Sequence, residues 1–234
     1  VPDWTGTAID DVFIGAGFIG DIGTSAWGIQ ADVVVNQFGG RFIYLTVGTA
    51  TTAEIRHQPA ANGLLQIEGA AGGVLTTLHS WGPCIIASTV PTLTNAYIHE
   101  GQTIIRTGTN ALSGTFTIDQ GAEVTLERDY AACNVHGVLT LNSTGITPSG
   151  ATTVLAGGVL NLVKSGTWTA VTGTLEVKPG GVLDLSKLTA PVQLENLTHH
   201  VGAIKRMVKN GVDVTVNGTT TAVGGGWTTE YIGE

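Results

Sequence analysis

Short alternating runs of apolar and polar residues recur through the middle of the chain. Six of them lie between residues 113 and 186, and each has a glycine within its first two residues: SGTFTID (113–119), GAEVTLE (121–127), HGVLTLN (136–142), GGVLNLV (157–163), TGTLEVK (172–178) and GGVLDLS (180–186). Alternation of this length predicts β-strands that bury one face. The glycines predict sharp turns between the strands, because glycine adopts left-handed backbone conformations without strain.

The runs repeat at a nearly constant spacing. Phe116, Leu139, Leu160 and Leu183 occupy equivalent positions, and the differences between their residue numbers are 139 − 116 = 23, 160 − 139 = 21 and 183 − 160 = 23. Two looser series have about the same period. The first consists of Ile55, Leu75, Tyr97 and Phe116, and the second of Leu65, Ile85, Ile104 and Thr125. A repeat of about 22 residues indicates a solenoid, and two series indicate at least two strands in each coil.

We therefore predict an all-β fold, a single parallel β-helix of about 21–22 residues per coil with six to seven coils. Parallel strands joined by crossovers prefer right-handed connections, so we expect right-handed winding. Stacking the coils predicts inward columns of Phe116/Ile118, Leu139/Leu141, Leu160/Leu162 and Leu183/Leu185. Between them, Thr117, Thr140, Asn161 and Asp184 are expected to point outward.

The two ends of the chain do not follow the repeat, and we expect three parts: residues 1–52 as an N-terminal cap or contact segment, 53–190 as the β-helix, and 191–234 as a C-terminal cap. Within the last part, apolar residues at helical spacing predict a short helix over 196–210. An Asn-Gly pair at 217–218 between alternating runs predicts a hairpin over 212–223.

A run of three glycines, 224–226, precedes the final residues. We expect it to act as a joint that lets the tail pack on another subunit. Trp and Tyr are the residue types that most often anchor interfaces, so the candidate interface residues are Trp4, Trp27, Trp227, Tyr231 and Ile232. Burial within the N-terminal cap is the alternative for Trp4 and Trp27.

Composition narrows the possible partners. Charged residues make up 12% of the chain and the net charge is −8, so nucleic acid is not expected as a partner. No apolar run reaches the length of a transmembrane helix, so no membrane partner is expected. Cys84 and Cys133 are separated along the chain by more than two coils, beyond disulfide reach, and we expect two reduced, buried thiols.

Candidate chemistry is sparse. Glu100 and Asp119 follow equivalent strands and form the best carboxylate pair, but both precede turns and are expected to be turn residues. Arg106 is expected to form a cross-coil ion pair with the group Glu127, Arg128 and Asp129. His79 and His99 lie about one coil apart and are expected to stack, without the spacing of a metal site. We assign no catalytic, cofactor-binding or metal residue, and expect no cofactor and no enzymatic activity.

Over residues 53–186 the repeat resembles the parallel β-helices of phage tailspikes and other virion proteins, pectin-degrading lyases and bacterial surface adhesins. Among these classes we expect a non-enzymatic structural protein on the surface of a phage virion, such as a capsid decoration component, because the sequence shows no catalytic constellation, little charge, capped ends and a flexible tail with aromatic residues. It would act through protein–protein contacts as a homo-oligomer, with a trimer expected, on partners such as the capsid shell. A carbohydrate-binding or carbohydrate-cleaving receptor spike with a glycan partner, or a fragment of a secreted adhesin at the cell surface, are the alternatives that the same fold allows.

Overall fold

The structure is a computed structural model in which every regular element of the described residues is a β-strand. For residues 9–14, 19–22, 33–37, 42–47, 51–59 and 171–172 it describes the backbone alone, and it describes residues 64–69, 74–90, 92–108, 110–143, 146, 148–163 and 173–233 in full. The chain divides into two compact units, Val1–Thr115 and Phe116–Glu234. Each unit is a stack of parallel strands, which confirms the predicted all-β solenoid.

The first unit contains two parallel sheets, and alternate strands of the chain belong to alternate sheets. The first sheet consists of β1 (Ile9–Ile14), β3 (Val33–Gln37), β5 (Thr51–Pro59), β7 (Val74–Ser80) and β9 (Thr92–Ile98). The second sheet consists of β2 (Ile19–Ile22), β4 (Phe42–Val47), β6 (Leu64–Gly69), β8 (Cys84–Ile86) and β10 (Gly101–Ile105). One strand of each sheet makes one coil, as the two sequence series predicted. Strand β11 (Leu112–Ile118) crosses the division between the units.

The second unit follows the same plan. Its first sheet contains β13 (Tyr130–Val135), β15 (Thr152–Val154), β17 (Val171–Val177), β19 (Val192–His200), β21 (Val214–Val216) and β22 (Thr220–Val223). Its second sheet contains β12 (Ala122–Leu126), β14 (Val138–Leu141), β16 (Val159–Leu162), β18 (Val182–Asp184), β20 (Ile204–Val208) and β23 (Thr228–Ile232). The paired strands are parallel throughout.

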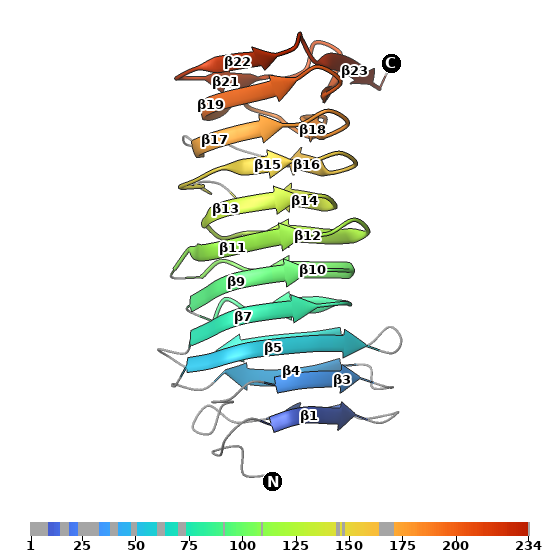
Figure 1. Cartoon of the computed structure of the whole chain (residues 1–234), viewed down its shortest axis with the longest axis vertical. Coiled ribbons are helices and arrows are strands. Elements are labelled where there is room, and N and C mark those ends of the chain that lie inside the picture. The colour runs from blue at the N-terminus through green and yellow to red at the C-terminus, as the bar shows by residue number, and fades with distance from the viewer. Residues whose placement is uncertain are drawn as a thin grey trace. The chain divides into compact units, whose positions relative to one another are not determined.

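The winding is right-handed, as predicted. In Figure 1, β1, β3 and β5 cross the front from left to right, β4 returns behind them, and successive coils lie higher. Each coil contains one strand of the second sheet, so these strands count the coils. Seven of them fall between residues 53 and 190: β6, β8, β10, β12, β14, β16 and β18. This number confirms the prediction of six to seven coils.

The register of the central column is confirmed in part. Leu139 lies beside Leu160, and Leu160 beside Leu183, and each is at most 2% exposed. Phe116, however, belongs to β11, and Val124 is the residue beside Leu139. The difference in residue number between Val124 and Leu139, 139 − 124 = 15, is shorter than the predicted repeat, so coil length varies with the loops. A constant period therefore placed Phe116 and Ile118 in the wrong sheet.

The looser series are wrong in register at several steps for the same reason, although Ile104 does lie beside Ile85 as predicted. Ile55 lies beside Leu78 rather than Leu75, and Leu65 lies beside Cys84 rather than Ile85. The alternation itself is correct, because the strands described with side chains bury mainly their inward apolar residues. The interior is mainly aliphatic, although its two largest fully buried side chains are Tyr130 and Phe116, and apolar burial is the main term that stabilises each coil.

Glycine turns join the two sheets, at Gly157 and Gly180 where the sequence predicted them and also at Gly202, where it predicted a helix. Gly157, Gly180 and Gly202 have φ angles of 80°, 76° and 80°, in the left-handed region that favours glycine. The Gly157 N–H donates to the Gly180 carbonyl at 3.0 Å, and the Gly180 N–H donates to the Gly202 carbonyl at 2.8 Å. The turns thus stack on one another and continue the ladder around the corner of the coil.

Pairing begins well before the boundary that was predicted at residue 53. Strands β1 to β4 join the two sheets in parallel, with Val33 beside Ile55 and Ile43 beside Leu65. The segment 1–52 therefore contributes strands to the coils. Its frequent glycines interrupt the apolar runs, which hid this repeat in the sequence.

The predicted C-terminal helix and hairpin are both wrong. Residues 192–200 and 204–208 are strands, separated by a turn at Gly202 that no helix could accommodate. Strands β21 and β22 do not pair as a hairpin, because both lie parallel to β19. The Asn217 N–H donates to the Leu194 carbonyl and the Gly218 N–H to the Glu195 carbonyl, both at 2.8 Å. These bonds keep β21 and β22 one after the other along β19, in the same coil.

Candidate functional site

The C-terminal end of the second unit is where the stack of strands stops. Strands β21 and β22 pair with β19 on one side, and β23 pairs with β20 on one side, so the three are edge strands. Figure 1 shows them above β19 at the end of the stack. Unpaired strand edges can accept further strands, so natural proteins usually cover them.

Exposed apolar side chains gather at this end. Among the side chains that the structure describes, the exposed large hydrophobic residues are Val201, Val208, Val223, Tyr231 and Ile232. All lie in the last two coils. Tyr231 is 58% exposed and Ile232 is 40% exposed. A cluster of exposed apolar groups beside open strand edges is typical of a protein–protein contact surface, and we name residues 213–232 together with Val201 and Val208 the end surface.

The prediction made for the C-terminal tail is only partly correct. Tyr231 and Ile232 are exposed as expected, but they belong to β23, which pairs with β20 of its own chain. Trp227 is half-buried against His199 and Lys205, so it packs on its own solenoid instead of extending freely from it. The three glycines form the turn into β23, with φ angles of 76° and 140° at Gly224 and Gly225. Trp4 and Trp27 lie outside the described residues.

Polar groups replace aliphatic ones inside the last coils. Lys205 lies beside Leu183 and His199 beside Val177, so both continue inward columns. The Lys205 ammonium lies 5.2 Å from the centroid of the Trp227 ring and pairs with the Asp213 carboxylate at 2.6 Å. These groups close the end of the core, because they prevent the aliphatic columns from meeting water directly.

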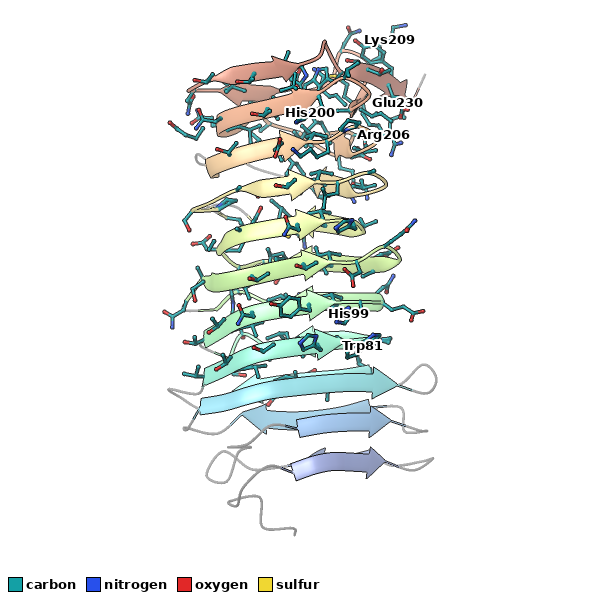
Figure 2. All side chains as sticks on the ribbon, viewed as in Figure 1. Trp81, His99, His200, Arg206, Lys209 and Glu230 are labelled. Carbon is teal, nitrogen blue, oxygen red and sulfur yellow. The ribbon has the colours of Figure 1, made fainter. Side chains whose placement is uncertain are left out.

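Ion pairs hold the outer faces of the last coils together. Arg206 lies between Asp184 and Glu230 in neighbouring coils, with Nη1 3.5 Å from Asp184 Oδ2 and Nη2 3.0 Å from Glu230 Oε2. On the other sheet Glu176 accepts hydrogen bonds from Lys178 and His200, and these bonds, that from Lys178 first, lower the pKa of the Glu176 carboxyl. Figure 2 shows His200, Arg206 and Glu230 on these coils. The pairs are partly exposed, so each contributes little to stability.

A cluster of aromatic rings occupies the outer face of the first unit, at β7 and β9 (Figure 2). His79 stacks on Tyr97 at 4.7 Å between centroids, and Trp81 stacks on His99 at 4.3 Å. His79 Nδ1 lies 3.0 Å from His99 Nε2, which confirms that the two histidines meet. Their centroids are 5.3 Å apart and their planes differ by 7°. The short nitrogen distance and nearly parallel planes mean that the imidazoles meet edge to edge in one hydrogen bond, in which either ring can donate.

This edge-to-edge contact is not a preformed metal site. In this hydrogen bond one facing nitrogen carries the hydrogen and the lone pair of the other accepts it, so neither is directed at a metal ion. In the part of the chain that the structure describes, no group of three or more His, Cys, Asp or Glu side chains is arranged to hold a metal ion.

The candidate carboxylates lie in turns, as the sequence indicated. Glu100 is exposed directly before Gly101, whose φ is 78°. The Asp119 carbonyl accepts the Ala122 N–H at 3.1 Å and closes a turn. Two expectations concern residues of different units: that Glu100 lies close to Asp119, and that Arg106 pairs with the group 127–129. Both stay predictions.

Cys84 and Cys133 are buried and free, as expected. Burial raises the pKa of the Cys84 thiol to about 12 and that of Cys133 well above its usual range, so neither is a reactive thiolate. Among the described elements there is no helix, and thus none with the length and apolar character needed to cross a membrane.

The sequence pattern did not reveal the inward positions of His199 and Lys205. The signal was available, because the residue numbers of Leu183 and Lys205 differ by 205 − 183 = 22, and those of Val177 and His199 differ by 199 − 177 = 22. Both spacings equal one coil. The helical interpretation of residues 196–210 ended the repeat too early and placed Lys205 on a solvated face.

Comparison of the chain with protein-family models, with curated proteins and with solved structures finds no match. The function must therefore be argued from the site itself.

Proposed function

We propose that the chain is a non-enzymatic structural protein of an assembled particle, a surface or decoration component of a phage virion, and that its end surface makes the contacts. The observation that carries this proposal is the coincidence of open strand edges with exposed Val223, Tyr231 and Ile232 on β22 and β23. An enzyme would be expected to place a few polar groups in a concave, mostly apolar pocket instead.

The partners that suit this surface are proteins. A second copy of the chain, as in a homo-oligomer such as a trimer, or a neighbouring shell protein would cover the apolar groups and satisfy the strand edges. The low charge of the chain, 12% of residues, fits contacts made through apolar and uncharged polar groups. A place on the virion surface is part of the same proposal.

A glycan-binding role is the second candidate, and the aromatic cluster of His79, Trp81, Tyr97 and His99 favours it. Aromatic rings on an outer face are groups on which sugars can pack. The rings stack on one another, however, and their faces are largely occupied. Polysaccharide binding that is abolished by Trp81→Ala would favour this role over the structural one.

Changing Tyr231 and Ile232 together to serine tests the structural role. Both are exposed, so we expect the free energy of unfolding to change by about 0.5 kcal/mol or less. Loss of two apolar anchors should weaken self-association at least about tenfold, since about 1.4 kcal/mol corresponds to a tenfold change. Sedimentation equilibrium over a range of concentrations measures both the mass and the association constant.

The matched control is Ala132→Ser, an apolar-to-serine change at an exposed position of β13. It should leave association unchanged. A wild-type chain that is monomeric at every concentration, or a double variant that associates as well as the wild type, would contradict self-association through the end surface.

A further inference from the structure

The groups that close the C-terminal end of the core include one buried histidine, a residue type whose charge depends on pH. We propose that the last coil, residues 213–232, is an acid-released plug: protonation of His199 frees Trp227 and uncovers the edges of β19 and β20. This device goes beyond the structural role proposed above, because it can be measured on the isolated chain.

His199 occupies an inward position of β19 and is 7% exposed. Its ring stacks on Trp227 at 4.7 Å between centroids, with 21° between the planes. The Nδ1 atom is buried and has no hydrogen-bond partner. A neutral imidazole has one nitrogen without hydrogen, and such an atom tolerates burial better than an N–H of a charged ring, which needs an acceptor.

The charged groups around His199 oppose a second positive charge. On its own strand His200 is adjacent, and from β20 Lys205 extends toward the same Trp227 ring. The two carboxylates of this region already form ion pairs. Asp213 pairs with Lys205, and Glu176 pairs with Lys178 and His200. The residues beside His199 on β17 and β22 are Val177 and Ala222, which bring no charge.

Two effects compete when His199 becomes protonated. Stacking on the Trp227 face would favour the imidazolium, because the face of an aromatic ring attracts a cation. Burial opposes it, and Lys205 already lies over the same ring. Burial first, and then the charges of His200 and Lys205, lower the pKa of His199. Because the folded pKa lies below the ordinary value of about 6.5, stability is complete above that pH and is lost as the pH falls below it.

The last coil is the part that this loss would open. Its strands pair on one side only, whereas β19 and β20 are held by the coils behind them. Its side chains are half-buried or exposed, so few apolar contacts oppose its release. Acid would therefore expose a new pair of strand edges while the rest of the unit stays folded.

Hydrogen exchange of the full chain between pH 7.5 and 5.5, corrected for intrinsic rates, tests the proposal. Below about pH 6.5 the opening constant of the 213–232 amides should rise by up to about tenfold per pH unit until the folded pKa is reached. Amides of β14, β16 and β18 should keep their protection. His199→Phe keeps an aromatic ring against Trp227 and removes the titrating group, so its last coil should no longer respond to acid.

His136→Gln is the matched control, because His136 is an exposed histidine of the same unit and should leave the acid response intact. Lys205→Gln removes the competing charge and should reduce the response, which gives a second test if His199→Phe folds poorly. The proposal is overturned if acid leaves the wild-type last coil equally protected or better protected. It is also overturned if His199→Phe loses protection in acid as the wild type does.

Discussion

Replacing Leu160 with alanine is expected to lower the free energy of unfolding of the second unit by about 2–5 kcal/mol. Leu160 is 2% exposed and lies between Leu139 and Leu183 in the central column. Removing its side chain leaves a cavity with aliphatic walls in the coils above and below, which cannot collapse without moving paired strands. Chemical denaturation monitored by circular dichroism measures the loss.

The neighbouring Asn161 provides the control. Its amide donates to Thr140 Oγ1 at 3.2 Å on the outer face, where it is half-buried. Asn161→Ala should cost about 0.5–1.5 kcal/mol, the usual net contribution of one hydrogen bond. Equal losses from the two substitutions would show that the inward and outward positions of β16 have been exchanged.

Gly158→Ala is expected to destabilise the second unit by about 3 kcal/mol or more, as an overpacked site that cannot relax. A Cβ atom at this position would lie 2.1 Å from the Val135 carbonyl oxygen and 2.9 Å from its carbon. Both atoms belong to the backbone of the neighbouring coil, so the coils themselves would have to separate. The same denaturation experiment reports the change.

Gly157→Ala, one residue earlier, separates this clash from ordinary backbone strain. Gly157 has a φ of 80°, but a Cβ atom there would meet nothing within 4 Å. The expected cost is about 1–2 kcal/mol, that of placing a non-glycine residue in the left-handed region. If Gly157→Ala were the more damaging change, the close approach of the coils at Gly158 would be wrong.

The parallel solenoid could be predicted because its two signals are local. Alternation identifies strands, and glycine marks the turns, as at Gly157 and Gly180. Assignment of a strand to one of the two sheets requires the loop lengths, which the apolar pattern does not contain. Phe116 was misplaced for this reason, since its spacing to Leu139 matches the repeat while the pairing partner of Leu139 is Val124.

The C-terminal errors have a different cause. Leu197, Val201 and Ile204 happen to follow helical spacing, and the sequence contains no local feature that outweighs it except Gly202. The Asn-Gly pair at 217–218 is a strong hairpin signal, but long-range pairing of both strands with β19 prevails over local turn preference. Tertiary contacts of this kind are not encoded in a local pattern.

The sequence predicts some features of the candidate site correctly and misses others. The exposure of Tyr231 and Ile232 could be predicted because both follow the last repeat that the sequence pattern shows, and the contact of His79 with His99 could be predicted from their spacing. The internal role of Trp227 depends on two residues that are polar and yet face inward, His199 and Lys205. Polar residues at core positions break the pattern from which core positions are inferred, so a pattern-based prediction assigns them to the surface.

The most direct test of contact through the end surface is hydrogen exchange of the wild-type chain at concentrations below and above its association midpoint, at pH 7.5. Edge strands that become covered gain protection, because their free N–H groups acquire partners. We expect association to slow exchange in β21, β22 and β23, with little change in β14 and β16. Protection that appears elsewhere on association, with exchange in 213–232 unchanged, would contradict the end surface as the contact site.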